Sequence, residues 1–286
     1  MAGPYLIVLS AADPVATAVE ARWGTLASTG QSVDGAPIRR LPTGALVLRR
    51  PGLHVTDERL DRRLPGELAA SRPTLVFPSI HRSEQGVECL TVHPLGNPGP
   101  TAEVGGRPRT LNPTDPALMT ATFRALSERS VDVGVPATFE ATHHGPELGL
   151  PSFFVEIGFA SSAAPPAAAV RALADLLPSL DPRADDHVAL GVGGGHYAPH
   201  FSELARRRRW AFGHILSRHA LLDLDAPTAR AAWDGVPAAE GVLYARSADA
   251  QLPALAGLGP RLRDGIAPAR LEPVSVRDAS RPASGT

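Results

Sequence analysis

The chain has 286 residues, a formal net charge of −1, 43% hydrophobic residues and 20% charged residues. This composition excludes a disordered chain, a coiled coil and a collagen-like rod, and no stretch is apolar for the eighteen or so residues of a transmembrane helix. The near-neutral charge argues against a polyanion binder that relies on overall charge, and the single cysteine, Cys89, excludes a disulfide framework. We therefore expect a globular cytoplasmic protein.

Apolar runs bounded by turn residues predict strands that alternate with segments of helical spacing. The first run, 5–9, predicts a strand instead of a signal peptide, and Asp13 and Pro14 after it predict the N-cap and first residue of a helix that ends near residue 22. Further strands are expected at 45–48, 75–80, 88–92, 137–141, 152–157, 187–192, 210–216 and 241–244, and further helices at 115–130, 163–177, 202–209 and 227–233. The alternation predicts an α/β protein with a largely parallel sheet.

The organisation predicted along the chain is simple. No linker and no repeat divides it, so a single domain is expected over residues 1–273. Residues 274–286 are small, polar and rich in Pro and Ser, which predicts a disordered tail.

Polar clusters that carry histidine follow four of the expected strands. They are His81-Arg82-Ser83, His93 with Asn97, Thr142-His143-His144, and Gly193-Gly194-Gly195-His196-Tyr197. One such cluster is ordinarily a strand-exit turn. The carboxyl ends of parallel strands share one edge of a sheet, however, so four clusters predict a common pocket at that edge.

Histidines with nearby glutamates indicate either a zinc site or general acid–base chemistry. Glu140, three residues before His143, and Glu156, on the next expected strand, are candidate oxygen ligands or bases. The H-E-x-x-H motif is absent, so a metal-free site with histidine as the base stays open. Adjacent His143 and His144 face opposite ways in a strand, and only a turn, which Gly145-Pro146 favours, directs both into one site. Pro199 argues against a helix around His200.

The glycine run 191–195 does not indicate a nucleotide cofactor. His196 replaces the third glycine of a dinucleotide fingerprint, and the chain contains no lysine for a Walker loop. The backbone amides of Gly193, Gly194 and Gly195 are instead candidate donors to an oxyanion. A G-x-S-x-G elbow is absent and Cys89 lies in an apolar run, so we expect activated water as the nucleophile.

The arginines are grouped at four places, 39–40, 49–50, 62–63 and 206–209. A solvated surface is the ordinary explanation, and the absence of lysine is consistent with a coding bias. A local patch can nevertheless bind phosphates on a protein that is neutral overall.

Several long motifs resemble the archaeal and plant type of D-aminoacyl-tRNA deacylase. They are HRSEQGVECLTVHPLGN (81–97), FEATHHGPELGLPSFFVEIG (139–158), GVGGGHYAPHFSELA (191–205), GHI (213–215) and the opening VLSAADPVA (8–16). The resemblance covers about residues 5–245. It implies zinc-dependent hydrolysis of the ester between a D-amino acid and the 3′ end of tRNA, with aldehyde-modified D-aminoacyl-tRNA as a further substrate. It also implies a three-layer αβα fold similar to peptidyl-tRNA hydrolase and purine nucleoside phosphorylase.

Site residues follow from the clusters and the resemblance together. The catalytic candidates are Glu140, His143, Glu156 and His196, and the metal-ligand candidates are His93, His143, His144 and Glu156. The substrate-binding candidates are His81, Arg82, Ser83, Asn97, Gly193, Gly194, Gly195, Tyr197 and His214. Tyr197 is expected to stack on the terminal adenine of tRNA, and the arginine patches are expected to contact its phosphates.

Two other functions fit the same residues. One is a metal-dependent hydrolase of a different small ester or amide that is not attached to tRNA. The other is a non-catalytic protein that binds tRNA ends, although such a protein has no need of the histidines and glutamates.

We expect a monomer that binds neither DNA nor membranes. The chain departs from the family pattern at Ser217-Arg218-His219, which bears on the substrate more than on the reaction.

Overall fold

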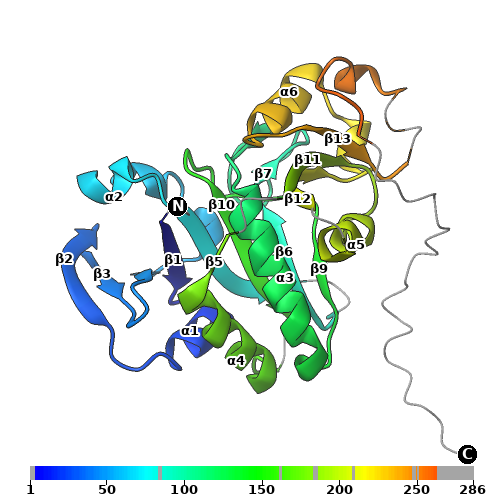
Figure 1. The fold of residues 1–286 in the computed structure, drawn as a ribbon. Coiled ribbons are helices and arrows are strands. Elements are labelled where there is room, and N and C mark those ends of the chain that lie inside the picture. Colours follow the sequence, from blue (N-terminus) through cyan, green and yellow to red (C-terminus); the bar gives the residue numbers. More distant parts are fainter. Residues whose placement is uncertain are drawn as a thin grey trace, which may run out of the picture.

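The computed structural model describes residues 4–82, 86–160, 163–182, 186–207, 210–246, 249 and 251–262 (Figure 1). Ser83, Arg208, Arg209 and the predicted tail at 274–286 lie outside these residues. Within the described part of the chain, no helix is both long enough and apolar enough to cross a membrane.

Most expected elements are present, with bounds shifted by a few residues. The strands are β1 Tyr5–Ser10, β2 Ala27–Val33, β3 Ala36–Arg40, β4 Leu46–Arg50, β5 Thr74–His81, β6 Cys89–Pro94, β7 Gly96–Asn97, β8 Thr110–Leu111, β9 Ala137–Phe139, β10 Ser152–Gly158, β11 His187–Val192, β12 Trp210–Leu216 and β13 Gly241–Tyr244. The helices are α1 Pro14–Glu20, α2 Gly66–Ala70, α3 Pro116–Val133, α4 Ala167–Leu176, α5 Pro199–Arg207 and α6 Ala226–Asp234. Short 3-10 turns include η1 His54–Thr56 and η2 Leu60–Arg63.

An eight-stranded mixed sheet forms the centre of the fold, in the order β2-β3-β4-β1-β5-β10-β6-β9. The four strands β4, β1, β5 and β10 run parallel, as do β6 and β9, whereas β6 is antiparallel to β10. The predicted α/β class with a largely parallel mixed sheet is confirmed. The reversed direction of β6 was not predicted, because a sequence pattern gives a strand's existence but not its partner.

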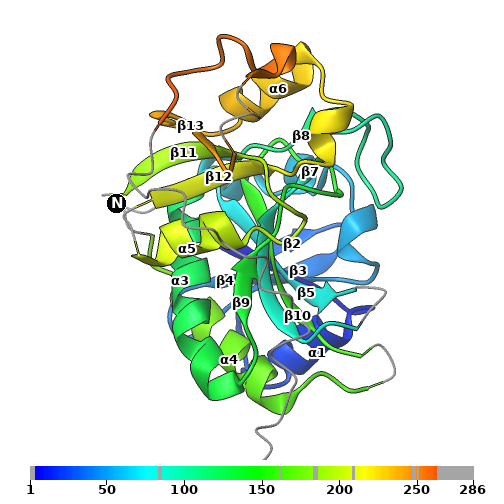
Figure 2. The ribbon, with the colours of Figure 1, turned by 90° about the vertical axis from the view of Figure 1, so that its right-hand side faces the viewer.

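A smaller parallel sheet, β12-β11-β13, lies beside the large one together with α5 and α6 (Figure 2). Its strands were expected, but as part of one sheet with the others. Backbone hydrogen bonds join the segment after β9 to the smaller sheet, among them the Thr142 amide to the Ile215 carbonyl at 2.8 Å. The single-domain organisation stays a prediction.

The two faces of the large sheet are covered differently. Helices α1, α3 and α4 pack on one face, where Val155 and Ile157 of β10 join the larger apolar core (Figure 1). Side chains alternate along a strand, so Phe154 and Glu156 point to the other face. There Phe154 belongs to a smaller apolar cluster with Leu60 and Leu64 of the η2 region.

The start of α1 is fixed to the end of β5. Asp13 is the N-cap, as predicted, and its Oδ1 accepts hydrogen bonds from the amides of Val15 and Ala16 at 2.8 and 2.9 Å. Its Oδ2 accepts from the Ser79 hydroxyl at 2.7 Å and the Ile80 amide at 3.0 Å. One carboxylate thus joins two elements at the carboxyl end of the sheet.

Two expectations were wrong or incomplete. Pro199 was expected to prevent a helix around His200, but α5 begins at Pro199. Proline is suited to a first helical position, because the amide it lacks would have no partner within the helix. The hairpin of β2 and β3 was not predicted, since its exposed strands lack a regular apolar pattern.

Candidate metal and catalytic site

The floor of the site is a polar area on one face of the large sheet, across β5, β10 and β6. In the strand register Glu156 lies between Ser79 of β5 and Thr91 of β6, and His93 lies opposite Phe154. Because paired residues and residues two apart share a face, His93 and Glu156 point the same way. Both are almost completely buried.

This location corrects the predicted pocket at a common carboxyl edge. Because β6 is antiparallel to β10, the ends of β5 and β6 lie at opposite edges of the sheet. His81 and His93 nonetheless approach Glu156 from its two sides. His81 Nδ1 is 3.2 Å from one carboxylate oxygen, and His93 Nε2 is 3.8 Å from the other. The site therefore lies on the sheet face.

Glu140 follows β9 and is fully buried beside these groups. Its Oε1 is 3.1 Å from His81 Nδ1, and its Oε2 lies 3.7 Å from His143 Nε2 and 3.6 Å from His196 Nε2. Glu140 thus connects the floor of the site to the loops above it.

The glycine loop between β11 and α5 is held against the segment after β9. The Ala141 amide donates to the His196 carbonyl at 2.8 Å, and the Ala198 amide donates to the Phe139 carbonyl at 2.9 Å. This pairing places His196 and Tyr197 over Glu140, where the Tyr197 hydroxyl is 2.9 Å from His81 Nε2.

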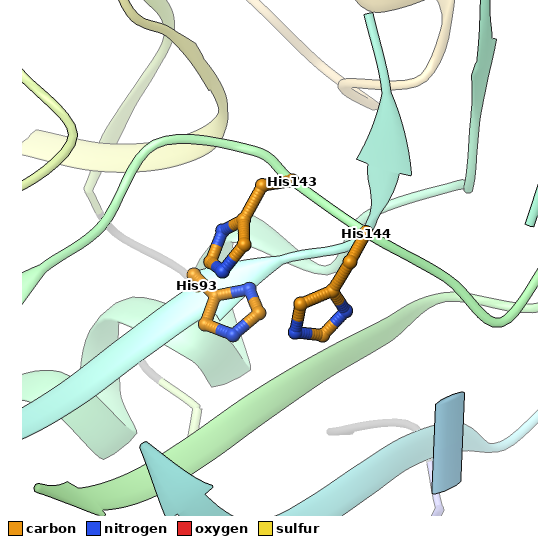
Figure 3. A group of neighbouring side chains, drawn as sticks. All are labelled: His93, His143 and His144. Atoms are coloured by element: carbon orange, nitrogen blue, oxygen red, sulfur yellow. The ribbon is translucent and has the colours of Figure 1, made fainter. Parts of the chain in front are cut away.

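The turn expected at His143-His144 directs both rings into the site. His144 has a left-handed backbone with φ of 43°, which breaks the alternation of an extended strand. Gly145 is required next, because a Cβ there would overlap the backbone of Gly105 and Gly106. The rings of His143 and His144 lie 4.4 Å apart, and each also contacts the ring of His93 (Figure 3).

Backbone carbonyls fix which nitrogen of each histidine carries a proton. The Nδ1 atoms of His93, His143 and His144 lie 3.2, 2.8 and 2.7 Å from the carbonyls of Pro94, Ala141 and Gly145. A carbonyl only accepts, so each Nδ1 donates and each Nε2 keeps its lone pair.

Burial keeps the histidines of the loops above the sheet, His143, His144 and His196, neutral. Burial lowers the pKa of His144 and of His196 to about 4, and it holds the pKa of His143 well below its usual value. A neutral imidazole is the form that binds a metal.

The two buried carboxyls differ in their proton affinity. Burial raises the pKa of Glu140 to about 7, despite the opposing charge of His81. Burial also acts to raise the pKa of Glu156, but hydrogen bonding by His81 holds it well below its ordinary value. Burial lowers the pKa of His81, and the two carboxylates more than reverse this. Of the two carboxyls, Glu156 is therefore ionised, whereas Glu140 gains and loses its proton near neutral pH.

The donor set fits a metal ion. One ring nitrogen from each of His93, His143 and His144 lies within 4.8 Å of the other two. Two further groups, Glu140-His143-His196 and His81-Glu140-Glu156, bring one possible ligand atom from each residue equally close, with a carboxylate oxygen from each glutamate. Among the described residues, His93 Nε2 has no hydrogen-bond partner although it is fully buried. It is an acceptor facing a carboxylate oxygen, and two acceptors at this distance repel unless a cation lies between them.

The substrate-binding candidates are placed less uniformly. Tyr197 and His81 lie in the site, Arg82 is exposed at the end of β5, and Ser83 lies outside the described residues. The amide of Gly193 donates to the Leu216 carbonyl at 2.8 Å, so it is not free to stabilise an oxyanion. The Asn97 amide group donates to the Gly105 carbonyl at 2.9 Å.

His214 lies in the core, away from open substrate space. Its Nε2 donates to the Asn112 carbonyl at 2.9 Å, and its Nδ1 accepts from the Thr142 hydroxyl at 3.1 Å. Burial lowers its pKa to about 4. His214 therefore fixes the start of the loop that carries His143.

Sequence reasoning missed two residues that shape the site. Phe154 stacks under His93 with ring centroids 5.3 Å apart and an interplanar angle of 6°, and it meets His144 edge-on. Gly158 allows close packing next to His81, since a Cβ there would overlap the Val87 carbonyl oxygen and the Cys89 sulfur and would crowd the His81 ring. The signal for Phe154 was available, because it lies two residues before Glu156 and therefore on the same face of the strand.

Most grouped arginines are engaged within the protein. Arg50 and Arg63 share Asp34 and Asp57 in one ion-pair network. Arg206 donates to the Ala137 carbonyl at 2.6 Å and covers the ring of Phe123. Arg39 and Arg49, by contrast, are about half exposed.

Comparison with known proteins gives one consistent description. A family model for D-aminoacyl-tRNA deacylase matches residues 70–251. A protein of Thermoplasma acidophilum with that description is 42% identical over 145 residues, which are 51% of this chain and 56% of the relative. One from Thermoplasma volcanium is 39% identical over 169 residues, covering 59% and 65%. One from Pyrococcus horikoshii is 36% identical over 193 residues, covering 65% and 69%. The chain therefore spans less than two thirds of the length of the two Thermoplasma relatives.

Among solved structures, a conserved protein of unknown function superposes with a TM-score of 0.75 at 27% identity. The match covers 88% of this chain and 91% of that protein. A purine nucleoside phosphorylase from Toxoplasma gondii matches at a TM-score of 0.38 and 9% identity, over 60% of this chain and 87% of that protein, which is too weak to bear on function.

Proposed function

The chain belongs to the D-aminoacyl-tRNA deacylase family, and from this premise we propose that it hydrolyses the ester between a D-amino acid and the 3′-terminal ribose of tRNA. The products are the free D-amino acid and tRNA. The observation that carries the proposal is the convergence of one ring nitrogen from each of three histidines beside a buried carboxyl whose pKa is about 7. Ester hydrolysis needs an electrophile for the carbonyl oxygen and a base for water, and this arrangement offers sites for both.

We assign His93, His143, His144 and Glu156 as the residues that would hold a zinc ion. Nitrogen ligands with one carboxylate are typical of catalytic zinc. When bound, zinc supplies Lewis acidity toward the ester carbonyl and toward water.

Glu140 is the proposed base. Its pKa of about 7 allows its carboxylate to take a proton from attacking water at neutral pH. His196 Nε2 is 3.6 Å from Glu140 Oε2, and its side chain is 46% exposed, so it passes that proton on to solvent. His81 hydrogen-bonds Glu156 and keeps this carboxylate charged and oriented.

Further features of the substrate follow from the same site. We propose that Tyr197 stacks on the terminal adenine, as aromatic side chains do with unpaired RNA bases. Aldehyde-modified D-aminoacyl-tRNA keeps the same ester and is proposed as a second substrate. We also propose that the protein acts as a monomer in the cytoplasm, where aminoacyl-tRNA is used.

The decisive experiment measures amino acid release from D-tyrosyl-tRNA and L-tyrosyl-tRNA by the purified full chain. We expect D-selective hydrolysis that a chelator abolishes and added zinc restores. Selective hydrolysis that survives complete metal removal would favour histidine as a metal-free base. Absence of hydrolysis by folded, zinc-loaded protein would overturn the deacylase proposal, and cleavage of small esters alone would then indicate a different hydrolase.

A further inference from the structure

A cavity of about 270 Å³ lies away from the histidine cluster, on the sheet face that α1 covers. In the antiparallel register of β3 and β4, Arg39 lies opposite Val47, so these two residues and Arg49 share that face. The lining comprises Ala11, Glu20, Pro37, Arg39, Val47, Arg49, Arg50 and Pro51. The group Arg39, Arg49 and Glu20 is called the arginine pocket below.

The positive charge of the arginine pocket is only half compensated. Glu20 Oε2 is 2.8 Å from Arg49 Nη1, and its Oε1 is 4.0 Å from Arg39 Nη1. Both guanidinium groups therefore share one carboxylate, while Arg50 is neutralised by Asp34 and Asp57. Like charges side by side on one sheet face repel each other. An anion in the cavity relieves that repulsion.

The arginine pocket lies at the same end of the sheet as His81. Ala11 and Pro51 directly follow the parallel strands β1 and β4, and His81 is the last residue of β5. Three strand spacings of about 4.8 Å separate β4 from β10, a distance of about 14 Å across the sheet. The cavity and the histidine cluster lie on opposite faces of the sheet, so a nucleic acid strand that ends at the cluster reaches the cavity by turning over this edge, within a few nucleotides.

We propose that the arginine pocket binds a backbone phosphate of the aminoacyl-tRNA substrate, close to its acceptor end. The planar fork of arginine matches phosphate oxygens in a bidentate manner, and two forks on adjacent strands hold one group from two sides. This inference rests on the proposed function, because it takes tRNA as the source of the phosphate.

The first test replaces both guanidinium groups in the full-length zinc-loaded enzyme, as R39Q/R49Q. With D-tyrosyl-tRNA we expect KM to rise about tenfold with kcat unchanged, because a phosphate contact far from the ester contributes equally to ground and transition state. The slope of log affinity for deacylated tRNA against log salt should fall by about 1 to 2. D-tyrosyl-adenosine, which has no phosphate, should be cleaved at the wild-type rate.

The variant Glu20→Gln should change KM in the opposite direction. It frees both guanidinium groups, so KM for D-tyrosyl-tRNA should fall about threefold and the salt dependence should steepen. A purely structural role for the Glu20 ion pairs predicts no gain in affinity. R171Q/R230Q, on exposed positions of α4 and α6, is the control for a loss of two positive charges and should leave KM unchanged.

Wild-type hydrolysis of D-tyrosyl-tRNA with an unchanged KM in R39Q/R49Q would overturn the inference and leave the proposed function standing. The inference would also be overturned if inorganic phosphate bound to the wild type, and not to R39Q/R49Q, without competing with tRNA, because the pocket would then take a free anion. Failure of the wild type to hydrolyse either tRNA ester would instead contradict the proposed function.

Discussion

The site is built from a floor on sheet strands and a rim on loops, and the two are held in different ways. His93 and Glu156 of the floor are fixed by the register of β6 and β10. His143, His144 and His196 of the rim depend on hydrogen bonds to the second sheet and on contact with the segment at 105–106. The rim is also more open, with His196 half exposed and His93 fully buried.

This difference suggests a division of work. Buried residues on paired strands have little freedom, which suits ligands that must keep a fixed geometry. Within the rim, the turn holds the proposed ligands His143 and His144, whereas His196 at the opening can exchange protons with solvent. The predictions below test this division, from the largest expected effect to the smallest.

The strongest contrast is between His93 and His196. We expect His93→Ala to lose bound zinc and about 10³-fold in kcat/KM, because a Lewis acid supplies several kcal/mol of transition-state stabilisation. His196→Ala should retain zinc and lose about tenfold to a hundredfold in kcat. Metal content and deacylation kinetics measure both. Equal metal loss in the two variants would contradict the division into floor and rim.

Gly145→Ala tests how the rim is held. The new Cβ would overlap the backbone of Gly105 and Gly106, so the turn that carries His144 must shift, at a cost of about 3 kcal/mol in the free energy of unfolding. Chemical denaturation and zinc affinity measure the two consequences. Gly99→Ala, where a Cβ has open space, is the control. If Gly145→Ala is as stable as this control and binds zinc normally, close approach does not hold the rim.

The link between the rim and the second sheet should make the protein sensitive to acid. Burial lowers the pKa of His214 to about 4 from a usual 6.5, so the unfolded state binds the proton more tightly. Stability from this residue is therefore unchanged above pH 6.5 and falls as the pH drops from 6.5 to 4. Between pH 7 and pH 5 the loss is about 2 kcal/mol.

Denaturation of metal-free protein at the two pH values measures this loss, and His214→Gln should remove about 2 kcal/mol of the pH dependence. His187→Gln, at the exposed end of β11, is the control for loss of an imidazole. If the free energy of unfolding depends equally on pH in the wild type and in His214→Gln, His214 is not the origin of the sensitivity to acid.

The smallest expected effect concerns the aromatic support of the floor. Phe154→Leu removes the ring under His93, and we expect zinc affinity to fall about tenfold, as for other residues that orient metal ligands. Phe153→Leu makes the same change on the opposite face of β10, in the helix-covered core, and should reduce stability without affecting zinc affinity. Equal zinc affinity in both variants would show that Phe154 only fills space.

Part of this site was accessible from the sequence. The apolar run of β10 contains a glutamate, and histidines follow several of the expected strands. Such positions are ordinarily apolar, so these polar residues indicated a functional site. Gly145-Pro146 indicated the turn that directs the His144 ring into the site. Phe154 was missed because a phenylalanine in a buried strand gives no local sign of what it packs against.

The roles of His214 and of the arginines required the tertiary structure. His214 was predicted to bind substrate, yet its two ring nitrogens are hydrogen-bonded to Asn112 and Thr142, far from it in the chain. Arg49 and Arg50 are neighbours in sequence but point to opposite faces of β4. Arg50 is neutralised by Asp34 and Asp57, whereas Arg49 shares the single carboxylate of Glu20 with Arg39.

By itself the sequence determined the α/β class, most elements and the identity of the candidate ligands, because apolar periodicity, capping residues and residue chemistry are local properties. Only the tertiary structure decided that β6 runs against β10, that a second sheet forms, and that the site lies on a sheet face instead of a sheet edge. Strand partners and directions depend on contacts between residues distant in the chain, and no local pattern records them.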